Sequence, residues 1–269
     1  EYKMIDVHGH ILTSVDDGSD SIECTLQNLE KAEKAGFSDI ILTPHYIENY
    51  YENKKDIIKF KINELKKYIY DQEILVEVHQ GNEILLTENT PQLLEVSEIS
   101  TLANSRYILF ELPFSNKMLD LDQIIYKVKA NGFIPILAHP ERYSYIQENP
   151  SNILEIIKLG VLIQSNYGSL IGQYGKSAKA TVEILLKNKL INFLGSDTHK
   201  QGNVYENIDI ILKRARDLIK DEKYIYEITT SNPNKILNDI YIIEKEEGKI
   251  NKKIAKENLK EFMKILHNK

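Results

Sequence analysis

Cysteine is almost absent from this sequence of 269 residues, and its scarcity excludes several kinds of site. The single cysteine, Cys24, rules out an intramolecular disulfide and a cysteine-rich zinc site. Cys24 does not begin a Cys-x5-Arg loop, so a mechanism through a cysteinyl phosphate is excluded as well. A phosphate-binding Walker loop is also missing, because the Gly-Lys-Ser stretch at 175–177 lacks the earlier glycine and the preceding strand.

The sequence also lacks a surplus of positive charge and any long hydrophobic run. The net charge is −6, without the basic excess of a nucleic-acid-binding protein, so we expect no nucleic-acid partner. No apolar run approaches the roughly 20 residues of a membrane span. The first residues lack the apolar core of a signal peptide. We therefore expect a cytoplasmic protein without stable membrane insertion.

Short β-rich runs alternate with longer amphipathic stretches over most of the chain. Residues 39–43 and 134–138 are typical of buried strands, whereas the apolar spacing over 22–35 and 178–188 predicts helices. About seven such strand–helix units follow one another. Because consecutive parallel strands need helical crossovers, this order predicts a parallel sheet.

No stretch within this alternating pattern has the composition of a linker. We therefore expect a single catalytic domain over residues 1–240. Residues 241–269 are dense in Lys and Glu and predict a charged helical extension. The apolar positions of this extension would pack on the domain or would form a contact in a homo-oligomer or with another partner.

Two histidines near the N-terminus form the first candidate metal-binding motif. His8 and His10 follow a predicted strand that ends at Val7, and side chains alternate along a strand, so both rings project from the same side. Gly9 between them leaves room for a divalent ion. Other residues of ligand type stand where further predicted strands end: His45, Glu83, Glu111, His139, Asp197 and His199.

The number of strand ends that carry such residues favours a closed barrel. In an open parallel sheet, only a few strands serve the site at a switch point. In a (β/α) barrel, the loops after all strands meet at one mouth. We therefore expect an α/β fold with a distorted (β/α)7 barrel.

The chemistry of these side chains indicates a site with several metal ions. Imidazole and carboxylate ligands without thiolates suit Mn²⁺, Fe²⁺, Zn²⁺ or Mg²⁺. The ligands exceed the needs of one ion, so we expect two or three. Metals about 3.5–4 Å apart hold a hydroxide at neutral pH and clamp an in-line displacement at phosphorus. Hydrolysis of a phosphoester by attack of a metal-bound hydroxide is the predicted reaction class.

Seven motifs occur in the order of a known family. They are Asp6-x-His8-x-His10, Val15-Asp16-Asp17-Gly18, Thr43-Pro44-His45, Gly81-Asn82-Glu83, Phe110-Glu111, Ala138-His139-Pro140-Glu141-Arg142-Tyr143 and Gly195-Ser196-Asp197-Thr198-His199. This set resembles the PHP superfamily and, within it, the bacterial manganese-dependent tyrosine phosphatases of capsule and exopolysaccharide loci. The His-Pro-Glu-Arg-Tyr string and the loop over 168–175 separate this branch from polymerase and histidinol-phosphatase relatives.

The resemblance implies a distorted (β/α)7 TIM-like barrel of the PHP type, with manganese as the cofactor. The implied substrate is phosphotyrosine on a bacterial kinase that regulates capsule or exopolysaccharide synthesis. The implied ligand groups are His8, His10, Glu83 and Asp197 for a first ion, Glu83, Glu111 and His139 for a second, and Asp17, His45 and His199 for a third. Among these, Glu83, Glu111 and Asp197 would belong to the catalytic machinery.

The resemblance also assigns a role to Arg142. Its guanidinium fork would bind the phosphoryl oxygens and stabilise developing charge. The alternative for Arg142 is a surface salt bridge with Glu141 or Glu148.

One departure from the family concerns phosphate binding. The family usually has a second arginine shortly after the Asp-x-His motif, but residues 200–205 contain none. Lys200 would supply a point charge there rather than a bidentate fork. A small-molecule phosphomonoesterase of the histidinol-phosphatase type therefore stays open as an alternative, and a non-catalytic metal-binding scaffold is a further one.

Other residues near these motifs have structural explanations. Asp6 faces away from the two histidines of its strand, so it cannot share their metal. Asp16 is expected to shape the turn at Gly18, and His79 to be a hydrogen-bonded structural histidine. The tyrosines that follow His45 either line the mouth to stack on a phenyl ring or are ordinary loop aromatics: Tyr46, Tyr50 and Tyr51.

Overall fold

The structure is a computed structural model that describes residues 3–200 and 203–242. The strands are β1 (Met4–Gly9), β2 (Phe37–Leu42), β3 (His45–Ile47), β4 (Tyr51–Glu52), β5 (Glu77–Gln80), β6 (Glu83–Leu85), β7 (Tyr107–Glu111), β8 (Ile134–Ala138), β9 (Leu162–Asn166) and β10 (Phe193–Gly195). The α-helices are α1 (Ile22–Lys34), α2 (Lys55–Asp71), α3 (Thr90–Glu95), α4 (Leu121–Ala130), α5 (Ser144–Glu148), α6 (Ile153–Ile157), α7 (Lys176–Lys187), α8 (Ile208–Ile219), α9 (Glu222–Tyr226) and α10 (Asn232–Leu237). The extension expected over residues 241–269 lies outside the described residues, apart from 241 and 242.

The strands form one closed ring. The strands lie in two sheets, in the orders β1-β2-β5 and β10-β9-β8-β7-β6-β3-β4. The two sheets are joined where the chain passes directly from β2 to β3 and from β5 to β6. The ring closes between β10 and β1, where Asp197 N donates to His8 O over 2.8 Å and His10 N donates to Thr198 O over 2.9 Å. Every pairing is parallel except that of the β3–β4 hairpin. The predicted distorted (β/α)7 barrel is confirmed.

The bend between β5 and β6 depends on a glycine. A Cβ at Gly81 would lie 2.9 Å from Leu102 Cδ2 and 3.0 Å from Ile41 Cγ2, so these side chains would have to shift to admit it. Glycine therefore lets the chain cross closely packed from the first sheet to the second. This crossing delivers Glu83, the first residue of β6, to the mouth of the barrel.

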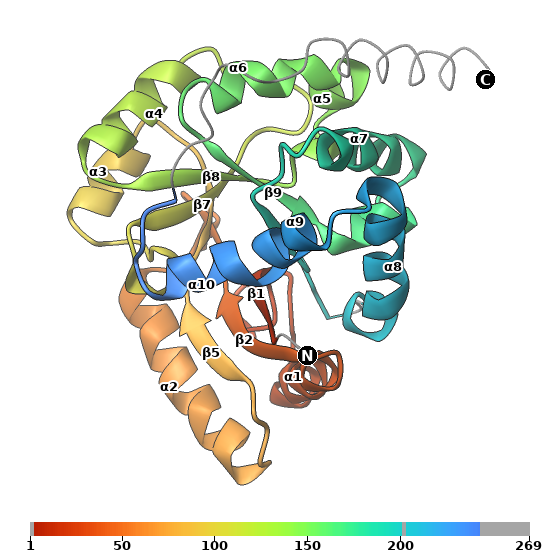
Figure 1. The fold of residues 1–269 in the computed structure, drawn as a ribbon. Helices are drawn as coiled ribbons and strands as arrows, with labels where there is room; N and C mark the ends of the chain where they lie inside the picture. The colour runs from red at the N-terminus through yellow and green to blue at the C-terminus, as the bar shows by residue number, and fades with distance from the viewer. Residues whose placement is uncertain (1–2, 201–202, 243–269) are drawn as a thin grey trace.

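The core has two layers that follow the period-two alternation of the strands. One cluster fills the barrel interior, with Val7, Ile41, Leu109, Ile136 and Phe193 from five strands. The alternate residues of the same strands face outward and pack under the helices, as Ile40, Ile108, Leu137, Ile163 and Leu194 do. Figure 1 shows the helices around the central strands.

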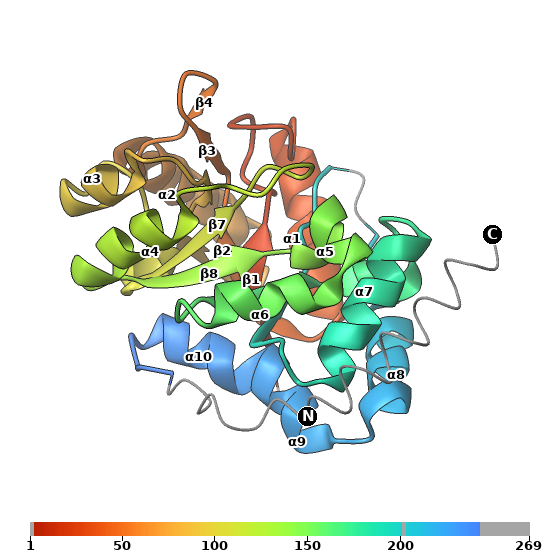
Figure 2. The same cartoon turned by 90° about the horizontal axis from the view of Figure 1, so that it is seen from above.

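The two ends of the barrel are built differently. Residues around α10 close the end where the strands begin, since Ile236 and Ile242 join the interior cluster. Tyr107 Oη donates to Ile240 O over 2.8 Å and accepts from Ile242 N over 2.9 Å, which ties this plug to the start of β7. Figure 2 shows the β3–β4 hairpin on one side of the molecule and α9 and α10 on the opposite side. Polar side chains are thereby gathered at the open end, where the strands finish.

Among the described residues, no helix combines the length and the apolar character needed to cross a membrane.

Candidate metal centre

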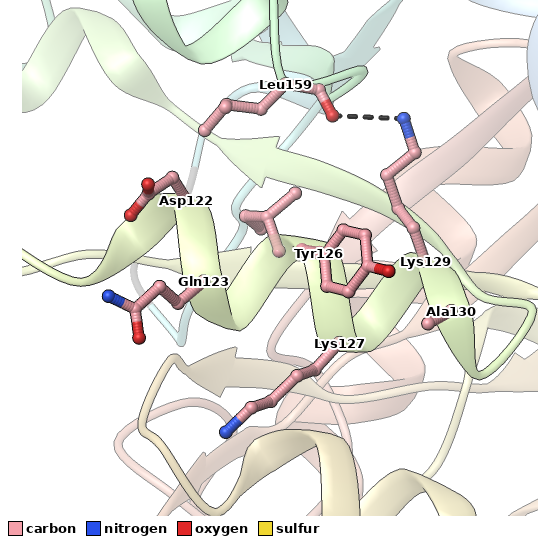
Figure 3. A pocket seen from close by; sticks show the side chains of 8 residues that line it. Asp122, Gln123, Tyr126, Lys127, Lys129, Ala130 and Leu159 are labelled. Atoms are coloured by element: carbon pink, nitrogen blue, oxygen red, sulfur yellow. Dashed lines mark hydrogen bonds between the residues drawn. The ribbon is translucent and has the colours of Figure 1, made fainter.

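A hollow on the outer surface contains none of the predicted site residues. It lies on α4, and its lining residues are Asp122, Gln123, Ile125, Tyr126, Lys127, Lys129, Ala130 and Leu159 (Figure 3). Lys129 Nζ donates to Leu159 O across it over 3.0 Å. The side chains that the sequence singled out lie instead at the carboxyl ends of the barrel strands.

Four buried side chains meet at the end of β1. The two ring nitrogens His8 Nε2 and His10 Nε2 are 3.0 Å apart. Glu83 Oε2 lies 3.3 Å from the first and 3.1 Å from the second, and Asp197 Oδ1 lies 3.5 and 3.6 Å from them. All four residues are at most 3% exposed. The structure therefore brings together the group expected for a first ion.

The geometry and chemistry of this group fit a divalent ion. Ligand atoms about 2.1 Å from one ion are about 3.0–3.4 Å apart, which is close to the separations between these atoms. Glu83 Oε2, His45 Nδ1 and His139 Nδ1 are buried without a hydrogen-bond partner. Buried polar atoms without partners are rare in native structures unless an ion or water satisfies them.

Partners outside the group orient the two histidine rings. His8 Nδ1 lies 2.9 Å from Gln164 Oε1, and His10 Nδ1 lies 2.8 Å from Asp16 Oδ2. Because both partners are acceptors, each Nδ1 carries the proton and each Nε2 presents its lone pair to the group. Sequence reasoning missed Gln164; the signal was a polar residue at an inward position of an apolar strand.

Asp16 has a second task besides holding His10. Its Oδ1 accepts from Gly18 N over 3.0 Å, which confirms the predicted turn, and its Oδ2 accepts from His45 N over 3.0 Å. The neighbouring Asp17 points away, with its side chain 57% exposed and Oδ1 3.6 Å from His45 Nε2. The two adjacent aspartates therefore serve opposite sides of the turn.

The structure brings together all of the expected third ligand group but only part of the second. Asp17, His45 and His199 do come together, and His10 joins them. Glu83 and Glu111 come together with His45 rather than with His139. His139 Nε2 instead lies 2.7 Å from Glu83 Oε1, on the other oxygen of that carboxylate. Glu83 therefore contacts four histidines of the site, His8, His10, His45 and His139.

Burial and neighbouring charges shift the pKa values of the three carboxylates in opposite directions. Burial raises the pKa of Glu83, but electrostatic interactions with the His8 and His139 rings outweigh it and hold this pKa well below its usual range. The pKa of Asp197 is also lowered, because the same two rings outweigh the effect of its burial. Burial and the adjacent charge of Glu83 raise the pKa of Glu111 to about 8. The site is a concentration of negative charge that cations relieve.

Two of the candidate ligands have left-handed backbone conformations. His139 has φ 34° and Asp197 has φ 51°. For residues other than glycine this conformation costs about 1–2 kcal/mol, and it persists where surrounding contacts impose it. In both cases it lies at the end of a strand and turns the side chain into the mouth.

Arg142 contacts the candidate ligand group and two aromatic rings. Its Nη1 donates to Asp197 Oδ2 over 2.9 Å. Its guanidinium lies over the rings of Phe114 and Tyr174, at 4.8 and 4.6 Å from their centroids. The alternative pairing with Glu141 is not made, since Glu141 Oε1 accepts from the backbone N of 166 and from the hydroxyl of 169. Lys200, which would supply a point charge for phosphate, is paired with an acid, since its Nζ lies 3.5 Å from Asp20 Oδ2.

The three tyrosines after His45 have different environments. Tyr46 is 3% exposed and belongs to the core, so it neither lines the mouth nor lies in an exposed loop. Its side chain joins the cluster under the helices, and its two neighbours in β3, His45 and Ile47, are less buried. The Tyr51 ring lies parallel to the His45 ring at 6.1 Å, and Tyr50, 73% exposed, contacts Tyr51 at 4.5 Å.

Besides Asp16, two other residues with predicted structural roles are hydrogen-bonded, Asp6 and His79. Asp6 accepts from Ser196 N over 2.9 Å and from Tyr205 Oη over 2.7 Å, on the side away from the ligand group. His79 Nε2 lies 2.8 Å from Asp39 Oδ1, so this histidine is hydrogen-bonded as expected.

Comparisons with known proteins agree with this architecture. The family described as "Capsular polysaccharide synthesis, CpsB/CapC" matches residues 4–238. The tyrosine-protein phosphatase YwqE of Bacillus subtilis is 34% identical over 196 residues, 73% of this chain and 77% of YwqE. The tyrosine-protein phosphatase CpsB of Streptococcus pneumoniae is 28% identical over 248 residues, 88% of this chain and 99% of CpsB.

Solved structures show the same fold. One from the pair YwqE of Bacillus subtilis and CpsB of Streptococcus pneumoniae, described as unique metal-dependent tyrosine phosphatases, matches with a TM-score of 0.84 and 30% identity, covering 90% of this chain and 97% of that one. The phosphotriesterase homology protein of Escherichia coli matches with a TM-score of 0.57 at 13% identity, over 88% of this chain and 98% of that one, which shows a shared fold alone.

Proposed function

The chain belongs to the CpsB/CapC family of capsular polysaccharide synthesis, and from this we propose that it is a metal-dependent phosphotyrosine-protein phosphatase. The observation that carries the proposal is the buried group of ligand atoms around Glu83 with the Arg142 guanidinium beside it. Relatives of the same family are named tyrosine-protein phosphatases. The solved structure that matches this chain with a TM-score of 0.84 is described as that of metal-dependent tyrosine phosphatases.

The proposed substrate is phosphotyrosine on a bacterial kinase that regulates capsule or exopolysaccharide synthesis. The family description supports the link to polysaccharide synthesis. The aromatic pair Tyr50 and Tyr51, which extends outward from His45, offers a surface for a phenyl ring. We expect the enzyme to act in the cytoplasm, in keeping with its composition.

The proposed cofactor is Mn²⁺, with two or three ions. The ligand atoms are imidazole nitrogens and carboxylate oxygens, which also fit Fe²⁺, Zn²⁺ or Mg²⁺. The residues that would hold the ions are His8, His10, Asp17, His45, Glu83, Glu111, His139, Asp197 and His199. When bound, such ions withdraw charge from phosphoryl oxygens and lower the pKa of water.

Residues of the chain itself would bind the phosphoryl group and exclude water from the site. Arg142 would bind the phosphoryl oxygens through its guanidinium fork, which is two-thirds or more covered and held between two rings. The burial of Glu83 and Asp197 excludes water from around the ligands and strengthens every charge interaction there. Asp17 and His199, the more exposed members, mark where a substrate would enter.

Phosphate release from a phosphotyrosine peptide tests this proposal. We expect release with Mn²⁺, complete loss with excess chelator, and a loss of about 10²–10³-fold for Arg142→Lys, which cannot form the fork. Arg106→Lys is the matched control, since Arg106 pairs with Asp239 at the surface, and should leave the rate unchanged. Preference for one small phosphorylated metabolite over any peptide would favour the small-molecule phosphomonoesterase, and a metal-loaded protein without any turnover would favour the scaffold.

A further inference from the structure

Tyr174 contacts both the candidate phosphate-binding arginine and a candidate metal ligand. Its ring centroid lies 4.6 Å from the guanidinium carbon of Arg142. Its hydroxyl donates to Asp197 Oδ2 over 3.1 Å.

The carboxylate of Asp197 is divided between two tasks. Its Oδ2 accepts from Asn166 Nδ2 over 2.7 Å, from Arg142 Nη1 over 2.9 Å and from Tyr174 Oη over 3.1 Å. Its Oδ1 faces His8 Nε2 and His10 Nε2. Three donors on one oxygen fix the rotation of the carboxylate, and this leaves the other oxygen to the ligand group.

The segment that carries Tyr174 is tied to the residue before Arg142. Glu141 Oε1 accepts from Asn166 N over 2.8 Å and from Ser169 Oγ over 2.7 Å. The segment then turns at two glycines with φ of +86° and +93°, at positions 172 and 175, where other residues would be strained. The ring of Tyr174 is therefore held in a set position relative to Arg142.

We propose that Tyr174 is a positioning residue with two separable roles. Its ring holds the plane of the Arg142 guanidinium for a phosphoryl group, and its hydroxyl holds Asp197 Oδ1 toward the two histidines. This inference rests on the proposed function, because it assumes that Arg142 binds a phosphoryl group. It goes beyond that function by assigning a task to a residue that neither ligates nor touches the reacting atoms.

Two substitutions separate the roles. Tyr174→Phe keeps the ring and removes the hydroxyl, so Mn²⁺ affinity measured by calorimetry should fall about 10–100-fold. With saturating Mn²⁺, its KM and its inhibition by inorganic phosphate should stay within about twofold of the unsubstituted protein. Tyr174→Leu removes the ring too and should also raise KM and the inhibition constant for phosphate by about tenfold, the scale of a cation–π contact that is partly desolvated.

Control variants separate the two roles of Tyr174 from a loss of folding and from a failure of the proposed function. Tyr126→Leu, at a 75% exposed tyrosine on α4, should change none of these values. If Tyr174→Leu does not fold, Tyr174→Met takes its place. Unchanged Mn²⁺ affinity in Tyr174→Phe would overturn the role of the hydroxyl, and an unchanged phosphate constant in the ring-deleted variant would overturn the role of the ring. Failure of the proposed function itself is a different result: no phosphotyrosine hydrolysis by the unsubstituted protein, whatever its Mn²⁺ affinity.

Discussion

Both ends of this barrel carry histidines and carboxylates, but only one end has the properties of a metal site. Where the strands finish, His8, His10, Glu83 and Asp197 are buried together. Near the start of β5, the group Asp39, Glu77 and His79 also brings ligand atoms within 4.8 Å of one another. Residue types and proximity are therefore shared by the two groups, and other physical properties must separate them.

The difference lies in how well each group is satisfied. Asp39 accepts from Ser38 Oγ over 2.7 Å and pairs with His79, and Glu77 is exposed to solvent. At the mouth, by contrast, Glu83 Oε2 is buried without a hydrogen-bond partner, and two ring nitrogens face each other at 3.0 Å. Two of the ligand residues there also have strained backbone. A group that is paired and solvated gains little from an ion, whereas a buried and unpaired one gains much.

The largest expected effect comes from the matched pair Glu83→Gln and Glu77→Gln. Glu83 contacts four histidines of the site, so its neutral isostere should lower phosphotyrosine hydrolysis by about 10³-fold or more. Glu77→Gln should leave the rate within about twofold. Equal losses in the two variants, measured at saturating Mn²⁺, would show that the two ends are not functionally distinct.

The next effect compares two aspartates that each pair with a histidine. Asp16→Asn weakens the orientation of His10, so Mn²⁺ affinity should fall about 10–100-fold. Asp39→Asn breaks the pair with His79 at the opposite end and should leave this affinity unchanged. Calorimetric titration of Mn²⁺ into both variants gives the measurement, and a similar loss in Asp39→Asn would place an ion at that end too.

A smaller effect concerns the aromatic rim of the mouth. Tyr51→Leu removes the ring that lies parallel to His45, so KM for a phosphotyrosine peptide should rise about 2–10-fold, the scale of one aromatic pair. KM for an alkyl phosphate should not change, because no phenyl ring is present. A parallel rise for both substrates would mean that Tyr51 supports His45 rather than the substrate.

The smallest effect is on acid stability. Partial burial raises the pKa of Asp39, but hydrogen bonds from His79 and Ser38 outweigh it and leave this pKa below its usual value. A depressed carboxylate pKa adds stability above the unfolded value near 3.8, and this contribution is lost as pH falls through the folded value. The stability of the unsubstituted protein, measured by circular dichroism, should therefore fall slightly as pH drops below about 4. In Asp39→Asn this fall should be absent, and the thermal unfolding midpoint at neutral pH should change little, because the pair is partly exposed.

Much of the fold was predictable because its determinants are local. The helix expected over 22–35 is α1, which Ser21 caps by accepting from Cys24 N. The strand expected over 134–138 is β8, with the same bounds. Apolar periodicity, a cap and a terminal glycine act within a few residues, so they are visible without the tertiary structure.

The partners of the site were less predictable because they come from distant parts of the chain. Gln164 lies 156 residues from His8, to which it is hydrogen-bonded. Tyr46, for which the sequence left open the mouth or an ordinary loop, is buried in the core. The polar character of Gln164 within an apolar strand is visible locally, but its partner is not, and the burial of Tyr46 has no signal in local spacing.

The sequence by itself determined which side chains stand at the ends of the strands, and hence that oxygen and imidazole ligands would gather at one mouth. Only the tertiary structure decided which of them meet. It brought His45 together with Glu83 and Glu111, left His139 on the other oxygen of Glu83, and placed Tyr174 against Arg142. The physical reason is that contacts of about 3 Å depend on the closure of the ring and on single backbone angles, such as φ 51° at Asp197, which no local pattern specifies.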